Sequence, residues 1–91
     1  MISSDIIRVL LIEDNIAEAR LLQEILKGSQ PKQFSWSHVQ RLKDGLAQLQ
    51  KKSFEVILLD LTLPDSQGLD SVVSLVQTVP QLPIVVLTNT N

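Results

Sequence analysis

The chain alternates between short apolar runs and segments in which apolar residues recur at helical spacing. Three runs are almost entirely apolar, at Ile6–Ile12, Val56–Leu59 and Ile84–Leu87. Continuous apolar runs of this length predict strands that are buried on both faces, as in a parallel sheet. A further segment, Phe34–Val39, alternates apolar with polar residues, which predicts a half-exposed strand near an edge of the sheet.

Segments with a helical period separate these strands. The pattern predicts amphipathic helices at Ile16–Lys27, Arg41–Lys52 and Leu69–Val79. Asn15 is expected to cap the first helix and Gly28 to end it. Strands and helices then alternate along the chain, which is typical of a doubly wound parallel sheet with helices on both faces. We therefore expect a single α/β domain over residues 1–91.

Composition narrows the class of protein further. The 91 residues carry a net charge of −2, contain no cysteine and include only Phe34, Trp36 and Phe54 as aromatic residues. The small negative charge gives no reason to expect binding to nucleic acid or to an acidic membrane. The lack of cysteine excludes disulfides and thiolate metal sites. No apolar run approaches the length of a membrane span, so a soluble, cytoplasmic domain is expected.

Acidic residues and one threonine directly follow the predicted strands. Glu13 and Asp14 follow the first strand, Asp60 follows the third, and Thr88 follows the fourth. In a parallel sheet these strand ends meet at one edge, where ligands bind in such folds. Carboxylates gathered there repel each other unless a cation lies among them. Their oxygens suit Mg²⁺, which neutralises a phosphoryl group and leaves an aspartate free to attack it.

The same residues resemble, in order and spacing, the motifs of the response-regulator receiver domain. The matching segments are Leu11-Ile12-Glu13-Asp14-Asn15, then Leu58-Leu59-Asp60-Leu61-Thr62-Leu63-Pro64-Asp65-Ser66-Gln67-Gly68, then Val85-Val86-Leu87-Thr88. The resemblance covers the whole chain. It implies a flavodoxin-like topology with strand order 2-1-3-4, and a function as the phosphoryl-accepting switch of a two-component phosphorelay.

The resemblance also implies a role for each candidate site residue. Asp60 would accept a phosphoryl group from a histidine kinase or a phosphotransfer protein, and Thr88 would be the switch hydroxyl. Asp14 would ligate Mg²⁺ directly and Glu13 would act through a water. Asp60 and the main-chain oxygen of Thr62 would complete the protein ligands. Such a chain is not an enzyme beyond its own phosphorylation and the slow loss of the phosphoryl group.

The chain departs from the family pattern after Thr88. Family members carry a lysine at the end of a fifth strand and an aromatic switch residue on that strand, and neither is present here. We therefore expect a receiver that is incomplete at its C-terminus, without the fifth strand and the last helices. Ile84–Leu87 would then form an open apolar edge, and such edges recruit other chains. A homo-oligomer through this edge is expected, and an inactive, self-associating fragment is the alternative to a working switch.

A less favoured alternative is an aspartate-nucleophile phosphohydrolase of the haloacid-dehalogenase type. Asp60-Leu61-Thr62 has a faint likeness to the opening motif of that family. In that family, however, the nucleophile ends the first strand and a second acid lies two residues on, where this chain has Thr62. Taken alone, Glu13 and Asp14 can also be ordinary residues at a helix N-terminus. His38 is interpreted as a plain strand residue and Trp36 as a packing residue.

Overall fold

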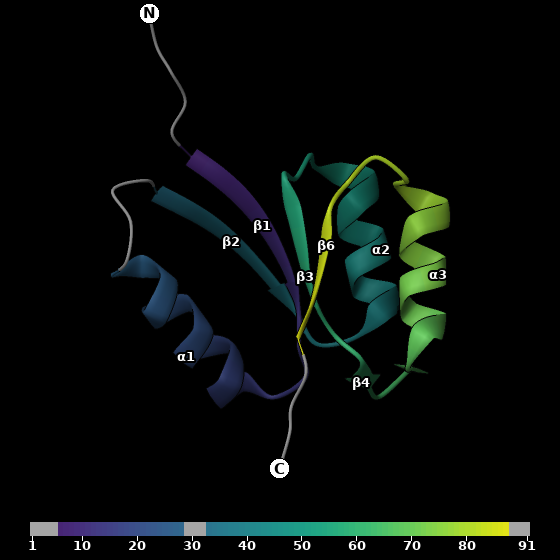
Figure 1. Ribbon diagram of the computed structural model, residues 1–91, viewed down its shortest axis with the longest axis horizontal. Coiled ribbons are helices and arrows are strands. Elements are labelled where there is room, and N and C mark those ends of the chain that lie inside the picture. Colours follow the sequence, from purple (N-terminus) through teal and green to yellow (C-terminus); the bar gives the residue numbers. More distant parts are fainter. Residues whose placement is uncertain (1–5, 29–32, 88–91) are drawn as a thin grey trace, which may run out of the picture.

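The computed structural model describes residues 6–28 and 33–87, which are built around a four-stranded parallel sheet (Figure 1). The strands are β1 (Ile6–Ile12), β2 (Gln33–Val39), β3 (Val56–Asp60) and β6 (Ile84–Leu87). Their order across the sheet is β2-β1-β3-β6, and every neighbouring pair is parallel. Since β6 is the fourth strand predicted from the sequence, the flavodoxin-like order 2-1-3-4 is confirmed.

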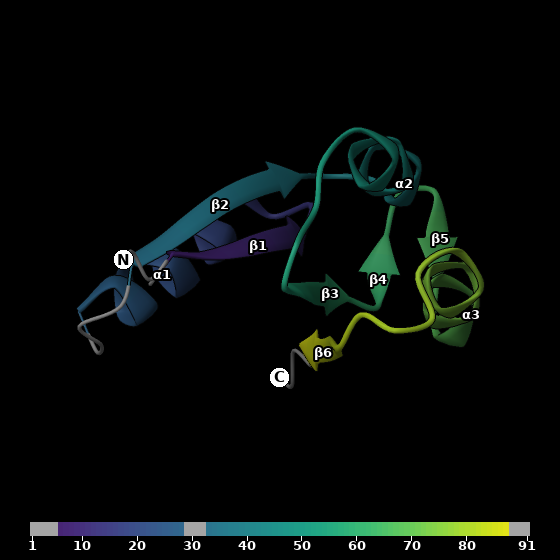
Figure 2. The ribbon, with the colours of Figure 1, turned by 90° about the horizontal axis from the view of Figure 1, so that it is seen from above.

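Three helices cover the two faces of the sheet. They are α1 (Ile16–Lys27), α2 (Leu42–Lys51) and α3 (Leu69–Thr78). Figure 2 shows α1 on one side of the sheet and α2 on the other, with α3 beside α2. The helices therefore lie within one residue of their predicted bounds, and the doubly wound arrangement is confirmed.

Strand β1 contributes to two separate hydrophobic cores because successive side chains of a strand point to opposite faces. Leu10 and Ile12 pack in the core under α2 and α3, which also contains Leu42 and Leu75. Val9 and Leu11 pack on the other face with Ala19 of α1, among other residues. This double burial explains the continuous apolar run of β1. By contrast, β2 lies at an edge of the sheet, as its alternating sequence predicts.

Helix α1 begins and ends at the predicted residues. The side chain of Asn15 accepts a hydrogen bond from the main-chain N–H of Glu18 at 3.0 Å. Gly28 directly follows the last helical residue, but its φ of −87° lies in the right-handed region. Gly28 therefore ends the helix without the left-handed turn that glycine often adopts at this position.

The segment between β3 and α3 has regular structure of its own. It forms a small antiparallel hairpin of β4 (Thr62–Leu63) and β5 (Ser66–Gln67). The main-chain N–H of Gly68 donates to the oxygen of Leu61 at 2.8 Å and closes the base of the hairpin. Gly68 has φ +60° and ψ −141°, a backbone conformation that residues with a Cβ rarely adopt.

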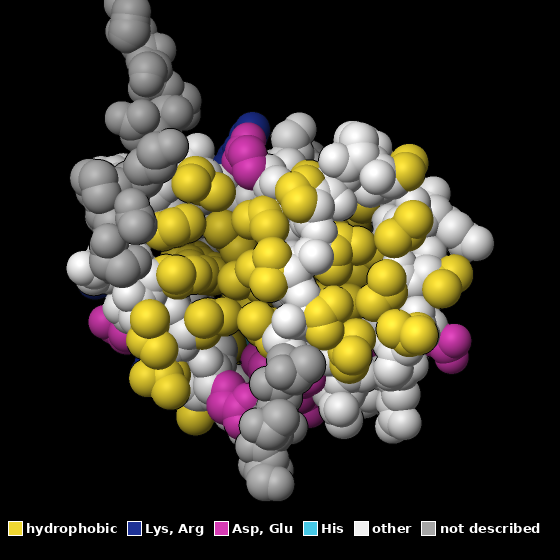
Figure 3. Space-filling model, viewed as in Figure 1, with side chains coloured by type: hydrophobic (Ala, Val, Ile, Leu, Met, Phe, Trp, Pro, Cys, Tyr) yellow, Lys and Arg dark blue, Asp and Glu magenta, His cyan; other side chains and the backbone are white. Residues whose placement is uncertain are grey.

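Many apolar side chains remain exposed on one side of the molecule. Figure 3 shows them spread from α1 across the sheet to α3. Over the whole surface of the described residues, the exposed large apolar residues are Ile6, Ile16, Leu21, Ile25, Leu69, Val73, Val76, Val85 and Val86. Large contiguous apolar patches are uncommon on the surfaces of soluble monomers. None of the helices in the described ranges is long and apolar enough to cross a membrane.

Candidate functional site

Three acidic side chains meet at the carboxyl ends of β1 and β3. The two strands are neighbours in register, with Ile12 opposite Leu59, so the residues that follow them emerge side by side. Carboxylate oxygens of Glu13, Asp14 and Asp60 all lie within 4.8 Å of one another. The structure thus brings together the three acids that the sequence placed at one sheet edge, while their roles stay predictions.

The main chain of Glu13 is fixed on both sides by the end of β2. Its N–H donates to the oxygen of Val39 at 3.0 Å, and its carbonyl oxygen lies 2.7 Å from Nε2 of His38. Because a carbonyl oxygen only accepts, Nε2 of His38 carries the hydrogen in this bond. The side chain of Glu13 accepts from the N–H of Asn15 at 3.1 Å. These bonds hold Glu13 in a nearly dry position, with 6 % of its surface exposed.

The surroundings of Glu13 favour its protonated form. The pKa of Glu13 is raised to about 7, chiefly by burial, and the N–H of Asn15 opposes the shift only in part. A hydrogen bond with the carboxyl of Asp60 and the charges of Asp60 and Glu18 contribute to the same rise. Without a cation, the folded protein therefore favours a protonated Glu13 up to about neutral pH.

Asp60 is the last residue of β3 and is half-buried. Its Oδ1 accepts a hydrogen bond from the main-chain N–H of Thr62 at 3.1 Å, which orients the carboxyl group at the strand end. In the sheet Asp60 is paired with Leu87 of β6. Thr88 follows Leu87 but lies outside the described residues, so its place beside Asp60 stays a prediction.

The donor set of this cluster fits a hard divalent cation. No lysine or arginine within residues 6–28 and 33–87 forms an ion pair with the three acids; the pairs that form are Arg8–Glu55 and Arg41–Asp44. The cluster offers oxygen donors, lacks a positive charge and includes an acid whose pKa is raised by burial. Mg²⁺ prefers oxygen ligands and needs only a few carboxylates beside water. The residues present therefore suit Mg²⁺.

Sequence reasoning missed two polar contacts near the site. Asp65, at the tip of the hairpin, accepts from the main-chain N–H groups of Leu42 at 2.8 Å and Lys43 at 3.0 Å. His38, interpreted as a plain strand residue, contacts the main chain of Glu13. Pro64-Asp65 signals a turn, but no local pattern pairs a turn residue with a helix 22 or 23 positions away.

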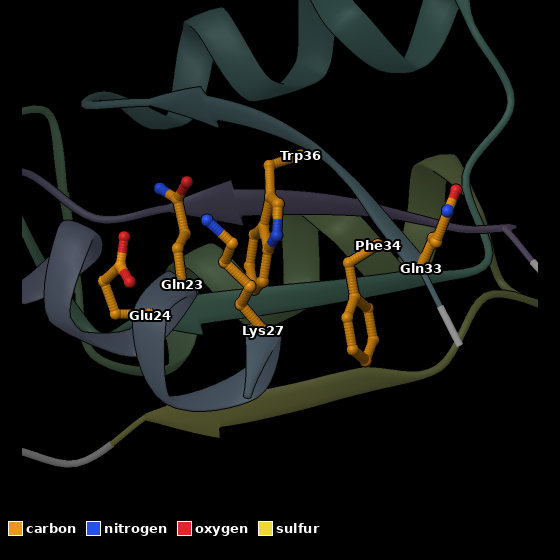
Figure 4. Close-up of a pocket in the computed structure, with 6 residues that line it drawn as sticks. All are labelled: Gln23, Glu24, Lys27, Gln33, Phe34 and Trp36. Atoms are coloured by element: carbon orange, nitrogen blue, oxygen red, sulfur yellow. The ribbon is translucent and has the colours of Figure 1, made fainter. Parts of the chain in front are cut away.

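A separate hollow of about 450 Å³ lies between α1 and β2 (Figure 4). Trp36 and Phe34 of β2 form one wall, with ring centroids 5.8 Å apart, and Gln23 and Lys27 of α1 lie opposite. Both rings also pack against the core beneath α1, which agrees with the interpretation of Trp36 as a packing residue. None of the three clustered acids lines this hollow, so it is not part of the candidate site.

Comparison with known proteins identifies a matching family and similar solved structures. The family model described as the response regulator receiver domain matches residues 9–91. The chain is 35 % identical over 96 residues to the response regulator Rcp1 of Synechocystis sp., covering 91 % of this chain and 62 % of Rcp1. The solved Mn²⁺-bound form of Rcp1 has a TM-score of 0.78 at 30 % identity, covering 92 % of this chain and 66 % of that one.

A second solved structure is similar to the same extent. The phosphorylated cyanobacterial phytochrome response regulator RcpA has a TM-score of 0.77 at 29 % identity, covering 91 % of this chain and 65 % of that one. The chain thus spans slightly under two-thirds of these relatives. The match to the family model nevertheless includes β6, the hairpin and all three clustered acids. The chain therefore belongs to the family of response regulator receiver domains.

Proposed function

We propose that the chain is the phosphoryl-accepting switch of a two-component phosphorelay, with Asp60 as the acceptor. The observation that carries this proposal is the convergence of Glu13, Asp14 and Asp60 at the ends of β1 and β3. Receiver domains are signalling domains rather than enzymes. The donor in this proposal is a phosphohistidine on a histidine kinase or on a phosphotransfer protein, and the reaction takes place in the cytoplasm.

In the proposed reaction a carboxylate oxygen of Asp60 attacks the phosphorus of the phosphohistidine. A new O–P bond forms while the N–P bond breaks, and the imidazole nitrogen keeps the electron pair of that bond. The N–H of Thr62 holds Oδ1 of Asp60 in place, so the carboxyl group does not rotate freely before the attack. Thr88 would donate its hydroxyl hydrogen to an oxygen of the transferred group.

The same acids are the proposed magnesium ligands. Asp14 and Asp60 would bind directly, Glu13 through a water, and the main-chain oxygen of Thr62 would complete the protein ligands. Bound Mg²⁺ supplies positive charge to the phosphoryl oxygens. The solved Mn²⁺-bound form of Rcp1, a relative of this chain, supports this proposal. Since Glu13 holds a proton near neutral pH in the metal-free protein, it must release that proton to contribute its full charge.

The test is to incubate the chain with Mg²⁺ and acetyl phosphate and to measure the intact mass. We expect one phosphoryl group on the wild type, lost after treatment with hydroxylamine, and none on Asp60→Asn. Asp14→Asn should need more Mg²⁺ for the same yield. A wild type that takes up no phosphoryl group, or an Asp60→Asn variant that still takes one up, contradicts the assignment. Repeated release of phosphate from the donor would instead favour the phosphohydrolase alternative, against which family membership argues.

We also propose that the chain associates with a second copy of itself through β6. This strand is at the edge of the described sheet, and Val85 and Val86 are 48 % and 39 % exposed. Unpaired apolar edges favour pairing with another chain. Light scattering should give a mass above that of one chain, falling to one chain in Val85→Lys. A compact wild-type monomer contradicts this proposal and leaves the proposal for Asp60 untouched.

A further inference from the structure

The N-terminus of α2 is capped by a residue that is distant in the sequence. The residue before α2 is Arg41, whose side chain makes no capping hydrogen bond. A guanidinium only donates, so it cannot satisfy the free N–H groups at the start of a helix. Asp65 takes this place: Oδ1 accepts from the N–H of Leu42 at 2.8 Å and Oδ2 from the N–H of Lys43 at 3.0 Å.

The charge on Asp65 suits this contact. A carboxylate at a helix N-terminus is stabilised by the partial positive charge there. Partial desolvation of Asp65 acts to raise its pKa, but the hydrogen bonds from Lys43 and Leu42, its own N–H and the charge of Arg41 outweigh this and lower the pKa. Asp65 is therefore ionised wherever the protein is folded near neutral pH, and it accepts both bonds.

Asp65 is also held firmly in the hairpin of β4 and β5, which follows Asp60. It lies between β4 and β5, and the hairpin begins at Thr62, two residues after Asp60. The hairpin is anchored by Leu63, which is 2 % exposed, and by the bond between the hydroxyl groups of Ser66 and the fully buried Ser71. In Figure 2, β4 rises out of the sheet toward α2. A shift of Asp65 therefore moves the main chain that leads back to Thr62.

The same end of α2 also leads to the acidic pair, through the end of β2. Helix α2 follows β2 after Gln40 and Arg41, and the oxygen of Val39, the last residue of β2, accepts the N–H of Glu13. The bonds of Asp65 thus join the two halves of the acidic cluster through the N-terminus of α2 and the end of β2. Glu13 and Asp14 lie on the β1 side, and Asp60 and Thr62 lie on the hairpin side.

We propose that Asp65 is a positioning residue for the phosphoryl site, holding Asp60 and the main chain of Thr62 in register with Glu13 and Asp14. This rests on the proposed function of Asp60. A residue that only stabilised α2 would lower the unfolding temperature when removed, without changing the properties of the folded site. A positioning residue changes the affinity for Mg²⁺ and the rate of phosphorylation in protein that is still folded.

The experiment compares Asp65→Ala and Asp65→Asn with the wild type and with Asp70→Ala. Asp70 is an exposed acid in the first turn of α3, so its removal changes the net charge equally. The temperature is chosen from unfolding curves so that every variant is folded. Calorimetric titration then gives the affinity for Mg²⁺, and intact mass gives the rate of phosphorylation by acetyl phosphate.

We expect Asp65→Ala to bind Mg²⁺ about tenfold more weakly, the low end of the loss that follows when residues that orient metal ligands from outside the ligand set are removed. Asp65→Asn should lie between this variant and the wild type, because an amide oxygen still accepts one of the two bonds. If Asp65→Ala does not fold, Asp65→Asn carries the comparison with Asp70→Ala, which should behave as the wild type.

Wild-type affinity and rate in both Asp65 variants, with only the unfolding temperature lowered, would overturn the positioning role and leave the acceptor assignment intact. A wild type that binds Mg²⁺ but takes up no phosphoryl group contradicts the acceptor assignment instead. In that case the Mg²⁺ affinities of the Asp65 variants still decide whether Asp65 positions the acidic cluster.

Discussion

The Nε2 atom of His38 lies 2.7 Å from the main-chain oxygen of Glu13, which joins the end of β2 to the acidic pair. This oxygen belongs to a residue that is 6 % exposed, so water cannot easily replace the imidazole. A buried carbonyl without a partner costs free energy. The neighbouring residue Val39 accepts the N–H of the same peptide segment. Two successive residues of β2 thus hold the main chain from which Glu13 and Asp14 project.

We predict that His38→Phe destabilises the protein by about 1–3 kcal/mol, because it keeps an aromatic ring but leaves the oxygen of Glu13 without a donor. His38→Gln should lose less stability, since its amide nitrogen can donate to the same oxygen. Urea unfolding followed by circular dichroism measures both. Ser35→Ala, an exposed site on the same strand, is the control. A His38→Phe variant as stable as the wild type shows that this bond does not contribute to stability.

The raised pKa of Glu13 predicts how stability depends on pH in the absence of divalent cations. The folded protein holds a proton on Glu13 up to about pH 7, whereas the ordinary value is 4.5. A folded state that binds more protons is favoured at lower pH. The contribution is therefore complete below pH 4.5 and is lost as the pH rises through about 7. After allowance for solvent screening, the free energy of unfolding should fall by on the order of 1–2 kcal/mol over this range.

Urea unfolding in a chelator between pH 5 and 8 tests this slope. The lowered pKa of Asp65 acts in the opposite direction, but only when the pH falls below the ordinary value of 3.8, so it does not contribute in this window. The free energy of unfolding of Glu13→Gln should be nearly independent of pH between 5 and 8. Saturating Mg²⁺ should also abolish the loss at high pH, because ionised acids bind the cation best. A wild type that is more stable at pH 8 than at pH 5 in the chelator contradicts the assignment to Glu13.

Gly45 marks a close approach between α2 and β1. A Cβ added at this position would lie 2.7 Å from Cδ1 and 3.2 Å from Cγ1 of Ile12, which is fully buried. Overpacking of this kind costs about 1–3 kcal/mol. The better helix propensity of alanine returns up to about 1 kcal/mol. We therefore predict a net loss of stability for Gly45→Ala in urea unfolding.

Two variants make the test of Gly45 specific. Ile12→Val removes the Cδ1 atom, so the double variant should lose less than the sum of the two single losses. Gly28→Ala is the matched control, because its added Cβ meets only the oxygen of Glu24 at 3.9 Å. It should be neutral or slightly stabilising. Equal behaviour of Gly45→Ala and Gly28→Ala would show that Ile12 moves aside without cost.

The sequence was sufficient for the parts of the fold that repeat a local pattern. The continuous apolar run of β1 and the alternating run of β2 each report how a strand is buried, and both strands lie where these patterns place them. The acidic cluster could be predicted because parallel strands end at the same edge, which brings Glu13, Asp14 and Asp60 together whatever the details of packing.

The sequence was not sufficient for contacts that depend on the three-dimensional path of the chain. The bonds of Asp65 to Leu42 and Lys43 join a turn to a distant helix, and neither segment carries a signal for the other. The same is true of His38, whose neighbours Ser37 and Val39 indicate only an edge strand. The raised pKa of Glu13 depends on burial and on the distance to Asp60, which a sequence does not contain.

Gly68 gives a last prediction, which concerns the loop that follows Asp60. Its φ of +60° and ψ of −141° lie in a region that is strained for any residue with a Cβ, although an added Cβ would meet no atom within 4 Å. Gly68→Ala should therefore cost about 1–3 kcal/mol through the backbone alone. Its N–H bonds to the oxygen of Leu61, so a backbone that relaxes to negative φ also breaks the base of the hairpin.

The Gly68→Ala backbone can keep its strained conformation or relax, and measurement distinguishes the two. If the hairpin keeps its form, Gly68→Ala lowers the free energy of unfolding, but the variant is phosphorylated at the wild-type rate. If the backbone relaxes, the bond to Leu61 is lost and phosphorylation by acetyl phosphate slows as well, because Thr62 and Asp60 lie on the same loop. Gln67→Ala, at the exposed neighbouring position, should change neither quantity. A Gly68→Ala variant with wild-type stability would show that the loop does not need the positive φ, since strain in a folded backbone must appear as a loss of stability.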